Sequence, residues 1–174
     1  GVRQSMNVDL TFLAVEIGIC LILAAIVLLR VGQQGGLSAA PFTPTVVPAS
    51  GNLVGGIIFA VLSFIGFETA AALGEETQNP HRNIPRAVFG SMIVVGIFYI
   101  IMAYVGTVGY GINHMATGFA NDPAPFDTIT RHYGNSFLVV LIDLVGVLSF
   151  FSAALAIING GARVIYTVGR DGLL

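Results

Sequence analysis

Four long runs of apolar residues alternate along the chain with stretches rich in glycine, proline and polar residues. A bilayer core requires about 20 apolar residues in helical form, and each run is at least that long. The linkers between the runs contain helix-breaking residues in clusters, which is typical of loops. We therefore predict four transmembrane helices, at residues 8–29, 51–76, 87–108 and 137–167.

Composition supports an all-α membrane protein. Hydrophobic residues make up 55% of the 174 positions and charged residues only 9%, whereas a soluble domain carries roughly 25% charged residues. The net charge of −2 argues against nucleic acid as a partner, and the single cysteine, Cys20, excludes an internal disulfide. Because the chain begins with glycine and stops after a short polar motif, we expect it to be an excerpt, with residues 1–174 forming part of a single transmembrane domain.

The basic residues predict the orientation of the chain. Five of them fall on one side of the four predicted helices and two on the other. The positive-inside rule therefore places both ends of this chain, and the loop at residues 79–86, in the cytoplasm. The larger group consists of Arg3, Arg82, Arg86, Arg163 and Arg170, and the smaller one of Arg30 and Arg131.

Two linkers carry further signals. In residues 79–86, Asn83 is a suitable N-cap for the third helix. Pro85 would then fall in the first turn of that helix, where proline is tolerated. In the longer linker, residues 124–134 favour a short surface helix.

The second apolar run contains Gly66 and the carboxylate of Glu68 near its centre. An acid at the centre of a membrane helix costs roughly 2.5–3.5 kcal/mol on insertion scales. An interruption at Gly66 would reduce this cost, with one half-helix ending near Phe64 and another beginning near Thr69. Its carbonyl end would attract an ammonium group or a cation, as in discontinuous transporter helices. A continuous helix, with Gly66 as a packing contact and Glu68 paired within the bundle, fits this stretch equally well.

Residues 64–87, FIGFETAAALGEETQNPHRNIPRA, resemble the sixth span of the amino acid–polyamine–organocation (APC) transporter superfamily. The shared pattern is Gly-Phe-Glu at a helix break, a Glu-Glu pair, and Asn-Pro-x-Arg-x-Ile-Pro. The N-terminal GVRQSMNV is similar to the start of the fifth span, and the C-terminal ARVIYTVGRDGLL to the end of the eighth. The resemblance implies spans five to eight of a transporter with a LeuT-like inverted repeat.

The resemblance also implies a substrate site, in which the backbone around the helix break receives the ammonium group of the substrate. Glu68 matches a position implicated in sensing protons or substrate, and Leu62 stands where an aromatic gate is often found. Arg3 occupies the place of a lysine, and arginine, unlike lysine, effectively cannot lose its proton. The backbone positions that match are Ser63, Phe64, Ile65, Gly66 and Phe67.

Glu16 is a further candidate for coupling. It shares one face of the first predicted helix with Asp9, Cys20 and Ala24, so we expect it to face protein and not lipid. Pairing with another span is the favoured interpretation, and direct coupling to transport is the alternative.

Two pairs of polar residues complete the candidates for coupling and gating. Ser149 and Ser152 belong to a stripe of small and polar residues that is typical of helix packing, although the resemblance places the eighth span beside a cation site. Glu75 and Glu76 lie near a helix C-terminus, where the dipole disfavours acids. We expect these two acids to form a cytoplasmic gate or a structural brace.

We predict secondary active transport of amino acids or related amines, with the proton favoured over sodium as coupling ion. The alternatives are an ion-independent exchanger and a scaffold subunit that does not transport. No catalytic triad stands out and the three histidines fall in loops, so we predict neither an enzyme nor a bound cofactor. The expected partners are the substrate, the bilayer of a plasma or inner membrane, and the remaining spans of the same polypeptide.

Overall fold

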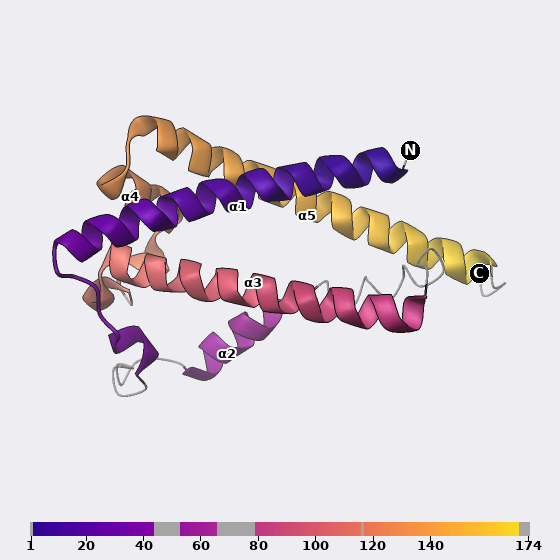
Figure 1. Cartoon of the computed structure of the whole chain (residues 1–174), viewed down its shortest axis with the longest axis horizontal. Coiled ribbons are helices and arrows are strands. Elements are labelled where there is room, and N and C mark those ends of the chain that lie inside the picture. Colours follow the sequence, from indigo (N-terminus) through magenta and orange to yellow (C-terminus); the bar gives the residue numbers. More distant parts are fainter. Residues whose placement is uncertain (1, 44–52, 66–78, 116, 171–174) are drawn as a thin grey trace. The chain divides into compact units, whose positions relative to one another are not determined.

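Every regular element in the described part of the chain is a helix (Figure 1). The computed structural model describes residues 2–43, 53–65, 79–115 and 117–170. Three short 3₁₀ turns lie at Ala40–Phe42, Ile112–His114 and Phe119–Asn121. The prediction of an all-α fold is confirmed by the five α-helices, which are α1 (Val2–Gln33), α2 (Leu53–Leu62), α3 (Pro80–Tyr110), α4 (Pro125–Tyr133) and α5 (Ser136–Arg170).

Three of these helices are long and apolar enough to cross a membrane: α1 over Leu10–Gln33, and α3 and α5 over their whole lengths. Each of these helices includes most or all of the apolar run from which it was predicted. In the remaining run, residues 51–76, the described helix is α2, with ten residues. At 1.5 Å per residue α2 is about 15 Å long, roughly half of the hydrocarbon thickness.

The start of α3 differs from the prediction. The helix begins at Pro80, so Asn83 lies inside it and is not its N-cap, and Pro85 falls in its second turn and not its first. Asn79 precedes the helix with a φ of 50°, and its carbonyl accepts hydrogen bonds from the N–H groups of Arg82 and Asn83, both at 3.0 Å. Proline suits a first helical position because its ring fixes φ and its missing N–H would have no helical partner there.

A glycine pair ends α1. Gly35 has a φ of +70°, a conformation that residues with a Cβ rarely adopt. The following N–H, of Gly36, donates to the carbonyl of Val31 at 2.9 Å, and that of Gly35 donates to Gly32 at 3.1 Å. This pattern matches a Schellman cap, which satisfies carbonyls that the helix leaves free.

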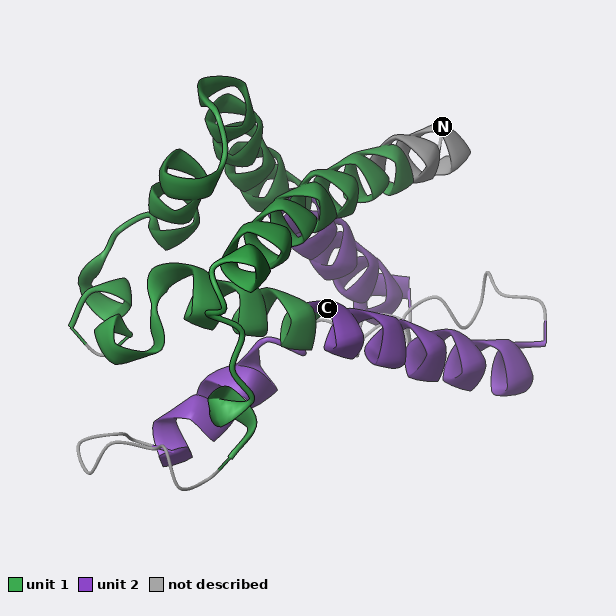
Figure 2. Ribbon diagram, turned by 60° about the vertical axis from the view of Figure 1, so that its left-hand side comes forward, with its two compact units in different colours: residues 1–51, 99–152 green, residues 52–98, 153–174 purple. Residues whose placement is uncertain are grey.

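The chain divides into two compact units (Figure 2). Unit 1 contains residues 1–51 and 99–152, and unit 2 contains residues 52–98 and 153–174. The helices α3 and α5 therefore each contribute residues to both units.

The core of unit 1 lies where α1, α3 and α4 meet. Leu23 and Val27 of α1, Val105 of α3, and Ile129 and Thr130 of α4 are all fully buried or nearly so. The amphipathic α4 confirms the short surface helix that residues 124–134 predict, and it covers this core with one apolar face.

Unit 2 has a different surface. None of its described residues is fully buried, and large apolar side chains such as Phe59 of α2 and Phe89 of α3 are exposed. Apolar surface of this extent requires lipid or further protein to cover it.

Candidate functional site

The α2 helix ends at Leu62, inside the second apolar run. The N–H of Ser63 still donates to the carbonyl four residues back, on Phe59, at 2.9 Å. The next two residues change the pattern: Phe64 donates to Val61 at 3.0 Å, and Ile65 to Leu62 at 3.1 Å. These three-residue bonds tighten the final turn, as is common where an α-helix terminates.

The Ser63 side chain also bonds to this helix end. Its hydroxyl donates a hydrogen bond of 2.9 Å to the same Phe59 carbonyl that accepts from its own backbone. A serine bonded back to the preceding turn often bends a helix. The described part of the second run therefore leaves regular α-helix at Ser63, three residues before Gly66.

The aromatic ring of Phe64 lies against α3 within unit 2. Phe64 is half-buried, and a Cβ on Gly96 would lie 3.6 Å from its Cζ atom, which is ordinary van der Waals contact. Glycine at position 96 therefore leaves space beside the ring of one predicted substrate-site residue. By contrast, Leu62 and Ile65 are exposed.

Several predicted site residues lie outside the described residues: Gly66, Phe67, Glu68, Glu75 and Glu76. Arg3 belongs to the first turn of α1 by its backbone, and its side chain is also outside the described part. Their proposed roles stay predictions.

Glu16 is buried on α1, with 9% of its surface exposed. Its Oε1 atom is inaccessible and has no hydrogen-bond partner among the described residues. One turn further along the same face Cys20 is half-buried, and Ala24 after it is buried, so this side of α1 faces protein. A buried carboxylate oxygen without a partner is costly.

The two serines of α5 differ in their surroundings. Ser149 is exposed and Ser152 is half-buried. The Ser152 Oγ atom is inaccessible and lacks a hydrogen-bond partner among the described residues. Whether either serine contributes to a cation site stays a prediction.

A polar cluster centred on Asp122 was not predicted. Its carboxylate accepts hydrogen bonds from the Thr128 hydroxyl at 2.6 Å, the Ala124 N–H at 2.9 Å and the Tyr110 hydroxyl at 3.0 Å. The hydrogen bonds from Thr128 and Ala124 hold the pKa of Asp122 below its ordinary value. The bond to Ala124, two residues on, forms an Asx-turn, and an aspartate before Pro-Ala-Pro is the sequence signal for it. This cluster fixes the start of α4 to the end of α3.

A second polar contact lies within α4 itself. The Arg131 Nε donates to Asp127 Oδ2 at 2.8 Å, one helical turn away. The carboxylate raises the pKa of Arg131 further above its ordinary value. Pairs of this kind on an exposed helix face contribute little to stability.

Residues 10–174 match the family model described as "Amino acid permease". A branched-chain amino acid permease of Lactococcus lactis is 30% identical over an alignment of 139 residues that covers 77% of this chain and 29% of that protein. A branched-chain amino acid permease of Bacillus subtilis is 25% identical over the whole chain, which covers 35% of its length. A lysine-specific permease of Lactococcus lactis is 27% identical over 81% of the chain and 27% of its own length.

The chain thus spans about a third of the length of these curated relatives. No solved structure matches it significantly. Its apolar helices and its permease relatives both indicate an integral membrane protein. Because the family consists of permeases, the prediction that the chain is not an enzyme is confirmed. The match over 165 of 174 positions (residues 10 to 174) covers nearly the whole sequence: the chain belongs to the amino acid permease family, within the APC superfamily.

Proposed function

We propose that the chain forms part of a secondary active transporter of amino acids or related amines. The observation that carries this proposal is the end of α2 at Leu62, in the middle of an apolar run long enough to cross a bilayer. A helix that stops at mid-membrane is otherwise costly, since its terminal backbone groups lose their helical partners. Transporters use such ends to bind substrate.

The charge at this helix end supports the proposed substrate class. The C-terminus of a helix carries a partial negative charge, which favours an ammonium group. The turn at Ser63, Phe64 and Ile65 stands at the C-terminal end of α2, and Gly66, Phe67 and Glu68 complete the proposed site. Curated relatives named as branched-chain and lysine permeases support an amino acid as the substrate.

The coupling ion is proposed to be the proton. Glu68 is the proposed proton-binding group of the substrate site, and Arg3 supplies a fixed charge where relatives of this superfamily carry a lysine. Glu16 is the second titratable candidate, since it is buried and an oxygen of its carboxylate has no partner within the described residues. The alternative coupling ion is sodium, bound at Ser149 and Ser152.

The proposed architecture is the LeuT-like inverted repeat, with this chain as spans five to eight. Both ends of the chain would face the cytoplasm of a plasma or inner membrane, because five of its seven arginines lie on that side. The acidic pair Glu75 and Glu76 would then stand near the cytoplasmic surface, as a gate or a brace.

The test is uptake by the full-length protein in proteoliposomes, with labelled amino acids and polyamines and with or without an inward proton gradient. Accumulation driven by the gradient is the expected result. Uptake that depends on internal substrate would instead identify an exchanger. Absence of both uptake and ligand-induced thermal stabilisation would identify a scaffold.

A matched pair of variants tests the site. Glu68→Gln should abolish or uncouple uptake, because it removes the proposed titratable group while keeping the size of the side chain. Asp143→Asn neutralises an exposed carboxylate of α5 outside the proposed site and should leave uptake intact. Full pH-dependent transport by Glu68→Gln would exclude the role of Glu68.

A further inference from the structure

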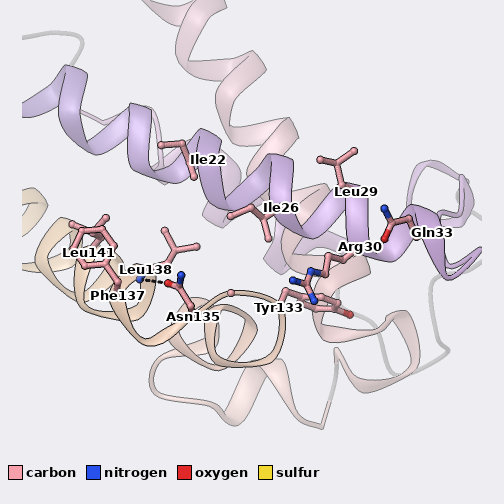
Figure 3. Close-up of a pocket in the computed structure, with 11 residues that line it drawn as sticks. Ile22, Ile26, Leu29, Arg30, Gln33, Tyr133, Asn135, Phe137, Leu138 and Leu141 are labelled. Atoms are coloured by element: carbon pink, nitrogen blue, oxygen red, sulfur yellow. Dashed lines mark hydrogen bonds between the residues drawn. The ribbon is translucent and has the colours of Figure 1, made fainter.

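A groove of about 650 Å³ lies in unit 1 between the C-terminal half of α1 and the turn that joins α4 to α5 (Figure 3). All of its lining residues belong to unit 1. The groove opens at the end of one predicted membrane helix and the beginning of another, so its mouth lies at the level where these helices leave the hydrocarbon.

Polarity changes along the length of the groove. Arg30, Gln33 and Asn135 line the end next to the helix termini, whereas Ile22 on α1 and Leu141 on α5 line the part further inside. Ile22 precedes Arg30 by eight residues, or about 12 Å along the helix. The groove therefore has a polar mouth and an apolar interior, which is the layout of an amphiphile that stands upright in a bilayer.

Arg30 gives the mouth its charge. Among the described residues that line the groove, Arg30 is the only charged one. It is exposed, and no carboxylate among the described residues forms an ion pair with it. In contrast, Arg131 is paired with Asp127 at 2.8 Å. The α5 helix also begins at the mouth, where the Asn135 Oδ1 caps it by accepting from the Leu138 N–H at 2.9 Å, and a helix N-terminus adds positive potential.

We propose that this groove binds an anionic phospholipid, with the phosphate at Arg30 and one acyl chain along Ile22, Ile26 and Leu141. A guanidinium binds phosphate with charge-assisted hydrogen bonds, and an acyl chain would cover the exposed side chain of Ile22 and the half-buried side chains of Ile26 and Leu141. A small polar solute would not require the apolar interior.

The binding test uses the purified full-length protein, delipidated in detergent, with added phosphatidylglycerol or with phosphatidylcholine of the same acyl chains. We expect phosphatidylglycerol to raise the Tm and to remain bound in native mass spectrometry, and phosphatidylcholine to do so far less. Arg30→Gln should weaken phosphatidylglycerol binding roughly tenfold, the effect of losing one charge-assisted hydrogen bond. Arg30→Lys should retain part of the binding, and Arg131→Gln should bind like the wild type.

The location is tested with a photoactivatable phosphatidylglycerol, followed by peptide mapping. Cross-links within residues 22–33 and 133–141 are expected. Cross-links only elsewhere would show that another span fills the groove and would overturn the proposal. Equal binding of both lipids, an unaffected Arg30→Gln variant, or the same stabilisation by glycerol 3-phosphate alone would overturn it as well.

Discussion

Gly109 of α3 lies directly against Val27 of α1. A Cβ at position 109 would be 3.0 Å from the Val27 Cγ1 atom and 3.3 Å from the Ile129 Cγ2 atom on α4. Val27 and Ile129 are themselves almost completely buried. The absence of a side chain at Gly109 thus allows three helices of unit 1 to approach one another at a single point.

Gly109→Ala should therefore destabilise the protein. Overpacking of this kind costs about 1–3 kcal/mol, and the better helix propensity of alanine returns about 1 kcal/mol at most, so a net loss of about 1 kcal/mol is expected. The Tm of the full-length protein in detergent measures the effect. In the double variant Gly109→Ala/Val27→Ala, the shortened side chain at position 27 leaves room for the added methyl group. The Tm of the double variant should therefore lie above the value expected from adding the two single effects. Strict additivity would show that the two residues do not meet as described.

The second prediction concerns Asp122, whose hydrogen bonds stabilise its ionised form. Because its pKa in the folded protein lies below the ordinary value of 3.8, this contribution is fully present above that pH and is lost as the pH falls through the lower, folded value. Thermal unfolding of the full-length protein, measured from pH 7 to well below the ordinary pKa of 3.8, should show a smaller acid-induced loss of Tm in Asp122→Asn than in the wild type. The variant should also start from a lower Tm at pH 7.

Two variants make the Asp122 experiment specific. Thr128→Val removes the 2.6 Å hydrogen bond alone and should reproduce part of the effect. Asp143→Asn removes a carboxylate that is exposed and should retain the acid dependence of the wild type. An Asp122→Asn protein with the same pH profile as the wild type would contradict the prediction.

Apolar run length was sufficient to predict the three long helices, because a helix that crosses a bilayer must satisfy its backbone internally and therefore needs an unbroken apolar stretch. It was not sufficient to predict the first residue of α3. Pro80 and Pro85 are both compatible with a helix start, and the choice depends on the backbone of Asn79, which has a positive φ immediately before α3.

The candidate site was predictable only in its local part. The interruption of the second run was one of two readings of Gly66 and Glu68, and it stays a prediction because both residues lie outside the described part of the chain. The position of the Phe64 ring next to Gly96 brings together residues 32 positions apart, and no local pattern predicts it. No local pattern predicts the hydrogen bond from Tyr110 to Asp122 either.

The contact of Phe64 with Gly96 gives the third prediction. A single methyl group on Gly96 would lie 3.6 Å from the ring, at ordinary contact distance, so Gly96→Ala should transport like the wild type. Gly96→Leu adds atoms that the ring must avoid, and a displaced Phe64 would disturb the proposed substrate site. We expect a higher KM, or a higher Kd in a thermal-shift titration with substrate.

The control for that experiment is Gly90→Leu, on the same helix at a position where a Cβ has no atom within 4 Å. It should leave the KM unchanged. Should Gly96→Leu and Gly90→Leu raise the KM equally, the effect would come from the bulk of leucine on α3 and not from Phe64.

The last prediction separates the two interpretations of Glu16. This residue is buried, and its Oε1 atom has no partner among the described residues, so we expect it to pair with a cationic group elsewhere in the full polypeptide. Breaking a buried pair from one side costs about 3–5 kcal/mol, since the other charge stays buried without compensation. Glu16→Gln should then lower the Tm of the full-length protein by several degrees, and Glu16→Asp, which keeps the charge, should lower it less. An unchanged Tm together with an altered pH dependence of uptake would instead assign Glu16 to proton coupling, because the carboxylate would then be required for transport and not for the fold.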